Sequence, residues 1–238
     1  VAASANAGNH NIAIGTDAMG AVEGYRSTTE IDGNIAIGTN ALLGGDLLNN
    51  NLDFVGNIAI GHNAISSTGN AQGMTGTIAI GQDALAALTS GAGNTAVGYS
   101  SGVGILTGAN NTVIGYNAFT SADGSESNNT IIGFQAGNSL NNQSGANSNT
   151  IIGYDADASS AAGNNQIVIG QGAVGVANDT VTLGNASVTA VYMSSDSQAL
   201  VHSAGIQFAG TQVANAGANV LDDYEEGQFD GVVAASGG

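Results

Sequence analysis

The chain of 238 residues contains no cysteine, proline, tryptophan or lysine, and Arg26 is its only arginine. Without cysteine there is no disulfide and no thiol chemistry, so stability must come from packing and hydrogen bonds. Binding of nucleic acid and docking on anionic lipid both depend on clustered Lys and Arg, so the composition argues against both. No apolar run approaches the roughly 18 residues that a membrane-spanning helix needs, so membrane insertion is not expected.

Acidic residues dominate the charge balance. Eighteen Asp and Glu against one Arg give a formal net charge of −17. The repulsion would be largely screened at seawater-like ionic strength, where the Debye length falls to a few Å. The composition therefore suits a saline setting.

A short motif, first seen as Asn11-Ile-Ala-Ile-Gly15, occurs ten times along the chain. Its closing glycines are Gly15, Gly38, Gly61, Gly81, Gly98, Gly115, Gly133, Gly153, Gly170 and Gly184. Recurrence of this kind predicts a solenoid. The shortest interval, 14 residues between Gly170 and Gly184, is too short for a helical repeat and suits two short strands with two tight corners.

Each motif is interpreted as one short strand. Its second and fourth residues, such as Ile12 and Ile14, share a face and are mostly β-branched, so we expect them inside the coil. The glycine is expected to turn the chain with positive φ, and the leading Asn to form an amide ladder. A small residue three places after most glycines, such as Ala18, is expected inside a second, narrower strand.

On this interpretation the third residue of each motif points outward and becomes more apolar toward the C-terminal end. The most apolar of these residues are Val113, Ile131, Ile151 and Val168. An uncovered apolar stripe is uncommon on soluble monomers, so the stripe predicts a subunit interface, the alternative being a mildly apolar solvent face.

The repeat Asn-x-Ala-Ile-Gly-x-x-Ala resembles the YadA-like head repeat of trimeric autotransporter adhesins over about residues 9–187. The resemblance implies an all-β, left-handed parallel β-roll of about ten coils, and a parallel homotrimer with the four stripe residues near its threefold axis. The insertions are longer than in that family and no heptad stalk follows. Residues 1–8 are expected to be a lead-in, and residues 188–238 a C-terminal strand-rich extension with an acidic tail.

A second resemblance lies in that tail, where Leu221-Asp-Asp-Tyr-Glu-Glu-Gly227 is similar to a segment of bacteriophage tail proteins. It implies a structural and host-attachment component of a phage tail fibre, located on the virion or outside the cell. The implied partners are further copies of the chain, other virion proteins, and a host-surface glycan or protein. A bacterial surface adhesin or extracellular fibre subunit is the alternative.

Two features are candidate recognition sites. The long insertions Met19–Gly33 and Leu42–Gly56 could contact a partner or simply cap the solenoid, and their candidate contact residues are Tyr25, Arg26, Glu30, Leu47, Leu48 and Phe54. Aromatic residues directly follow four motif glycines and should stack as a ladder, either as a structural feature or as a carbohydrate platform: Tyr99, Tyr116, Phe134 and Tyr154.

No catalytic constellation is present, so we do not expect an enzyme. His10, His62 and His202 lack metal-ligand spacing, and Asp17, Asp83 and Asp155 fall in different coils, which gives a polysaccharide depolymerase little support. No cofactor is expected, although the acidic cluster Asp222, Asp223, Glu225 and Glu226 could bind calcium instead of forming a solvated turn. An ice-binding solenoid would use a row of threonines. Thr95, Thr112, Thr130 and Thr150 form such a row, which this interpretation places inside the coil.

Overall fold

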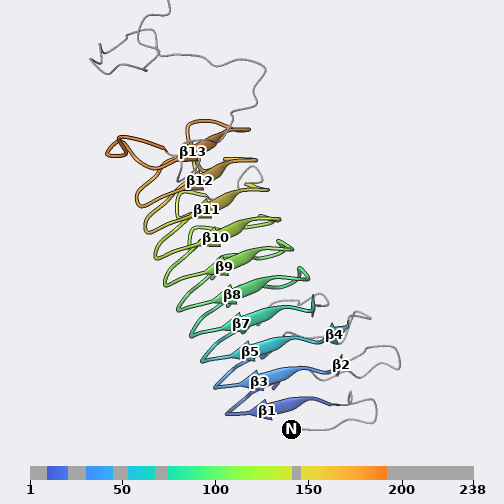
Figure 1. Ribbon diagram of the computed structural model, residues 1–238. Helices are drawn as coiled ribbons and strands as arrows, with labels where there is room; N and C mark the ends of the chain where they lie inside the picture. Colours follow the sequence, from blue (N-terminus) through green and yellow to red (C-terminus); the bar gives the residue numbers. More distant parts are fainter. Residues whose placement is uncertain (1–9, 21–30, 45–52, 68–73, 141–145, 192–238) are drawn as a thin grey trace, which may run out of the picture. The chain divides into compact units, whose positions relative to one another are not determined.

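The computed structural model describes residues 10–20, 31–44, 53–67, 74–140 and 146–191. These residues belong to one compact unit, Val1–Val191, and the second unit, Tyr192–Gly238, lies outside them. The described residues form an all-β parallel solenoid and include no helix (Figure 1).

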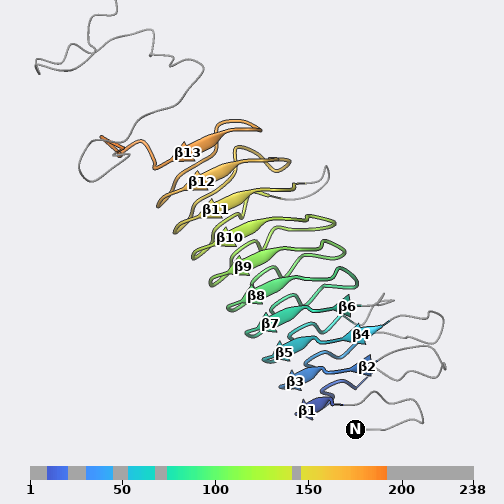
Figure 2. The same cartoon turned by 45° about the vertical axis from the view of Figure 1, so that its right-hand side comes forward.

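A ten-stranded parallel sheet runs the length of the solenoid, with one strand for each copy of the motif (Figure 2). Its strands, in order, are β1 Ile12–Ile14, β3 Ile35–Ile37, β5 Ile58–Ile60, β7 Ile78–Ile80, β8 Thr95–Val97, β9 Thr112–Ile114, β10 Thr130–Ile132, β11 Thr150–Ile152, β12 Ile167–Ile169 and β13 Val181–Leu183. A three-stranded sheet lies beside its N-terminal part, made of β2 Ile31–Asp32, β4 Phe54–Val55 and β6 Met74–Thr75.

Equivalent motif residues stand directly above one another. Ile12 pairs with Ile35, and Thr130 pairs with both Thr112 and Thr150. The strands are joined across coils by short backbone bonds, such as the 2.8 Å bond from the N–H of Ile35 to the carbonyl oxygen of Asn57. The predicted parallel, in-register stacking is therefore confirmed.

The motif glycine has the backbone conformation that its position predicts. Gly38 has φ of +130°, a region that L residues rarely adopt. A Cβ on Gly38 would lie 2.6 Å from the carbonyl oxygen of Gly61 in the next coil. The positive φ and the close approach of the next coil therefore each disfavour a side chain at this corner.

The prediction of which motif residues point inward is wrong. The third residue is the buried one: Ala36, Ala59 and Ile131 are fully buried, whereas Ile14 is 59% exposed and Ile132 is half-buried. The first residue, such as Asn57, is also fully buried, and alternation then places the first and third residues on the same inward face. The narrow coil accepts small or medium side chains there and turns the bulky pairs outward.

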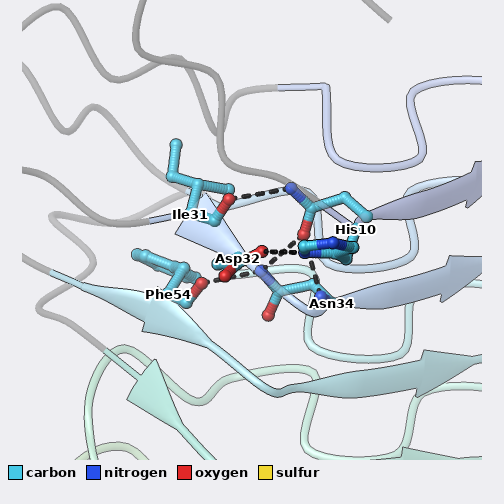
Figure 3. Close-up of polar contacts among 6 residues, drawn as sticks. His10, Ile31, Asp32, Asn34 and Phe54 are labelled. Atoms are coloured by element: carbon cyan, nitrogen blue, oxygen red, sulfur yellow. Dashed lines mark hydrogen bonds and ion pairs between the residues drawn. The ribbon is translucent and has the colours of Figure 1, made fainter.

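The predicted ladder of asparagine amides forms, but it lies on the inward face, which the prediction had assigned to the second and fourth residues. The Nδ2 of Asn34 donates to the Oδ1 of Asn11 at 3.0 Å and to the carbonyl oxygen of Phe54 at 2.6 Å (Figure 3). The same Oδ1 of Asn11 accepts the backbone N–H of Asn34 at 2.8 Å. These bonds satisfy buried amides that would otherwise be costly.

Small residues three places after the glycine are buried as predicted, but they do not lie in a second strand. Ala41, Ala64 and Ala136 are fully buried and belong to turns. In some coils the next residue in the chain complements the third motif residue in size, although Phe119 accompanies Val113 and both are large. Leu42 accompanies Ala36, whereas Gly137 accompanies Ile131, and a Cβ on Gly137 would lie 2.9 Å from the Cδ1 of Ile131.

The strand-rich extension expected over residues 188–238 has no strand in its described part, residues 188–191. The rest of the expected C-terminal extension and the lead-in at 1–8 lie outside the described residues. The domain boundaries at 8/9 and 187/188 remain predictions.

Candidate recognition surface

We define the outward face as the second and fourth residues of the ten motif strands. These residues form two parallel columns along the ten-stranded sheet. They are exposed or half-buried throughout, with exposed fractions of 48% for Ile12, 38% for Ile114 and 61% for Val181. The described solenoid thus leaves a row of apolar side chains along the whole sheet in contact with solvent.

No charged residue occurs among the twenty residues of the outward face, although the chain carries eighteen acids. Most of the twenty are Ile, and β-branched side chains on a sheet have few rotamers, so the surface is rigid. Large uncovered apolar patches usually mark an interaction site.

Four threonines interrupt the aliphatic residues of this face. We call them the threonine tract: Thr95, Thr112, Thr130 and Thr150, the second motif residues of β8, β9, β10 and β11. Their predicted inward orientation is wrong, since all four are half-buried on the outward face. None of the four hydroxyls has a hydrogen-bond partner within the described part of the chain.

The residues predicted for the subunit interface are therefore the wrong ones. Val113, Ile131, Ile151 and Val168 are buried in the core of a single chain, with exposed fractions of 1% or less. Side chains enclosed by their own coil cannot contact another subunit. The outward face provides the exposed apolar stripe that was assigned to them.

The aromatic ladder forms as predicted. Ring centroids are 5.1 Å apart for Tyr99 and Tyr116, 5.4 Å for Tyr116 and Phe134, and 5.2 Å for Phe134 and Tyr154, with interplanar angles of 16° or less. The two inner rings, Tyr116 and Phe134, are therefore covered on both faces, and the two end rings on one face each. This disfavours a carbohydrate platform, which needs free ring faces, and favours a structural role.

The predicted loop contacts fall mostly outside the described residues, as Tyr25, Arg26, Glu30, Leu47 and Leu48 all do. Phe54 is described and is fully buried in β4, between Ile31 and Met74 of the neighbouring short strands. Its assignment as a contact residue is wrong, because its side chain is buried in the hydrophobic core.

Among the described residues, no three His, Cys, Asp or Glu side chains come together to hold a metal ion. His10 Nδ1 lies 3.3 Å from Asp32 Oδ1 on the surface (Figure 3). Asp222, Asp223, Glu225 and Glu226 lie outside the described residues, so the calcium hypothesis remains a prediction.

Two carboxylates are drawn into the coils. Glu126 is fully buried and accepts the backbone N–H groups of Asp123 and Gly124 at 3.1 and 3.2 Å. Asp157 accepts the hydroxyl of Ser139 at 2.7 Å, and burial raises the pKa of its carboxyl despite the hydrogen bonds from Ser139 and Ala158. Neighbouring donors satisfy the hydrogen bonds of each carboxylate, so both carboxylates have a structural role at a corner of the coil.

Sequence reasoning missed the outward threonine tract and the true apolar face. Two signals could have found them. The leading Asn and the third residue share one side of the strand, and a column of amides is most stable away from water. The complementary sizes of Ala36 with Leu42 and of Ile131 with Gly137 also indicate that the third residue packs inside.

The described residues contain no helix that is long and apolar enough to cross a membrane. Comparison with protein-family models, with curated proteins and with solved structures found no match to this chain.

Proposed function

We propose that the chain is a structural and host-attachment component of a phage tail fibre or similar virion appendage, and that it works as a parallel homotrimer. The ten strands of the long sheet support about ten coils, and we propose a left-handed β-roll in keeping with the sequence resemblance. Coils that stack on one another give the stiffness that an appendage needs.

The outward face is the observation that carries the proposal. A single chain would leave twenty uncharged, mostly aliphatic side chains in contact with water along the whole sheet. Identical copies could bury this face around a common axis, because closed symmetric oligomers form from self-complementary or repeating surfaces. A fibre also has to bury most of its apolar surface to stay soluble.

The mass of the purified chain in solution tests the assembly. Light scattering should give three times the chain mass, and Ile132→Asp should release a folded monomer. A stable wild-type monomer would overturn the trimer. Labelling of native virions with an antibody to the chain should decorate the tail, whereas labelling of bacterial surfaces alone would favour the adhesin alternative.

An ice-binding solenoid is the second candidate, because the threonine tract lies outward and in register with Val97, Ile114, Ile132 and Ile152 beside it. A rigid, uncharged array of Thr and aliphatic side chains is suited to contact an ordered water lattice. This function needs the face to be free, so it requires a monomer. Inhibition of ice recrystallisation by a monomeric chain would support it, and a trimer without that activity would exclude it.

A further inference from the structure

We infer that the threonine tract sets the axial register in which copies of the chain associate through the outward face. The inference depends on the proposed self-association and adds to it a role for four particular residues. The partner is a second copy of the same chain, aligned parallel and strand to strand.

A face of equal repeats has a register problem. The strands of the long sheet are stacked at a spacing of about 4.8 Å, and six of them present an aliphatic pair outward. If all ten strands were alike, a second copy displaced by one coil would lose the contacts of only one strand in ten. Register is weakly specified wherever successive positions look the same.

The threonine tract breaks this equivalence. Ile78 precedes it and Ile167 follows it in the same column of second residues, so four hydroxyl-bearing layers are bounded by aliphatic layers. In register, each Thr faces Thr of the other copy, where hydroxyls can act as donor and acceptor for one another. Displacement by one coil places a hydroxyl against an aliphatic side chain at each end of the tract, and a desolvated hydroxyl without a partner is unfavourable.

The tract also selects orientation, because it is off centre. It occupies the fifth to eighth of the ten strands. In an antiparallel pairing a strand at place n meets place 11 − n, so the tract meets the third to sixth strands and only two of its four layers meet threonine. Parallel, unshifted association matches all four layers and keeps all ten strands in contact. An antiparallel pairing matches all four layers only when it is displaced by two coils, which leaves two strands of each copy uncovered.

The charge of the molecule favours a second copy as the occupant. The outward face carries no charge while the chain has a formal net charge of −17, so copies can approach over this face without opposing charges in contact. A basic partner would be drawn to the acids elsewhere and would gain nothing from an aliphatic face. Single polar positions in otherwise apolar interfaces are known to specify register and orientation.

Cross-linking can read the register directly, because the chain has no cysteine of its own. Two populations are prepared, one with Ile114→Cys and one with Ile132→Cys, and each is tested alone and mixed with the other. Oxidation to a disulfide, which requires the two Cβ atoms to lie within about 4.5 Å of each other, should couple like with like in register. Coupling of Ile114→Cys to Ile132→Cys reports displacement by one coil.

The test compares two backgrounds that change all four threonines. In the Thr→Val background, which keeps shape and removes the hydroxyls, displaced cross-links should rise about tenfold relative to wild type, since the mismatch at the ends of the tract disappears. In the matched Thr→Ser background, which keeps the hydroxyls, displaced cross-links should stay at the wild-type level.

Equal displaced cross-linking in wild type, Thr→Val and Thr→Ser would overturn the inference while leaving self-association intact. A wild-type chain that gives no cross-link and is monomeric by light scattering would overturn the proposed trimer itself, and with it this role of the tract. Far-ultraviolet circular dichroism of each background checks that the solenoid has folded.

Discussion

The first four strands of the long sheet, β1, β3, β5 and β7, differ from the next four, β8 to β11, although they share one motif and one register. In the first group the second residue is Ile, and a polar residue follows the glycine. In the second group the second residue is Thr, and an aromatic residue follows the glycine. The backbone therefore keeps its stacking while the exterior changes chemistry.

The interior differs as well, in a compensating way. The third residue is Ala throughout the first group, where large residues such as Leu42 and Leu85 fill the coil from the opposite corner. In β10 the third residue is Ile131 and the opposite corner has Gly137. The comparison teaches that one backbone stacking accepts different divisions of the core volume between the two sides of the coil, while two exposed positions change together from Ile and a polar residue to Thr and an aromatic residue.

The largest expected effect comes from placing a charge on either side of one strand. Ile131→Asp would bury an unpaired carboxylate, which should cost more than about 4–5 kcal/mol and abolish folding. Its neighbour Ile132→Asp should leave the coil folded and prevent association. Circular dichroism separates the first outcome from the second, and light scattering measures the second. Unfolding by Ile132→Asp alone would contradict the assignment of the outward face.

Exchanging the sizes of the residues at positions 131 and 137 would give a coil of the second group the core arrangement of the first group. Ile131→Ala should destabilise the chain by about 2–5 kcal/mol through a cavity. Adding Gly137→Leu should recover much of the loss, because Leu42 already occupies the equivalent left-handed position with φ of +50°. The free energy of unfolding in denaturant measures both steps. If the losses in the free energy of unfolding caused by Ile131→Ala and Gly137→Leu add in the double variant, the two side chains do not fill the same part of the core.

The aromatic ladder gives a smaller, local difference. Tyr116→Ala removes two stacked pairs and should destabilise the chain by about 1–3 kcal/mol, given roughly 0.5–1.5 kcal/mol for each pair. His62 occupies the equivalent place in β5's coil outside the ladder, so His62→Ala is the matched control and should change stability by less than about 0.5 kcal/mol. Similar losses in both variants would argue against a contribution from stacking.

The smallest effect concerns Asp157. Burial raises the pKa of its carboxyl above the usual 3.8, so the folded chain binds this proton more readily than the unfolded chain. Its contribution to stability is present below the unfolded pKa and is lost as pH rises through the folded pKa. The stability of wild type relative to Asp157→Asn should therefore increase as pH falls from neutral toward 4. Thermal unfolding across that range measures the trend, and a parallel pH profile in the two chains would refute it.

The spacing of the motif glycines was enough to predict the topology, because stacking in register leaves little freedom once the repeat is recognised. The positive φ of Gly38 and the ladder of Tyr99, Tyr116, Phe134 and Tyr154 followed from that register. The prediction assigned the buried and exposed faces of the strand the wrong way round. Period-two alternation determines which residues share a face, but it does not determine which face is buried. Greater hydrophobicity suggested Ile14 for the core, whereas the narrow coil has room for Ala13 there.

The asparagine column gives the solenoid a dipole moment along its axis. In each run the Nδ2 donates to the Oδ1 of the preceding coil, from Asn57 to Asn34 to Asn11 and again from Asn149 through Asn129 and Asn111 to Asn94. Sheet backbones contribute little net dipole, but aligned amides add head to tail as they do in a helix. The column is interrupted at Thr77, whose backbone N–H reaches Asn57 without an amide to pass the alignment on. Each run therefore has its positive pole toward β1, so an acidic solenoid built this way is polarised along its axis by uncharged side chains.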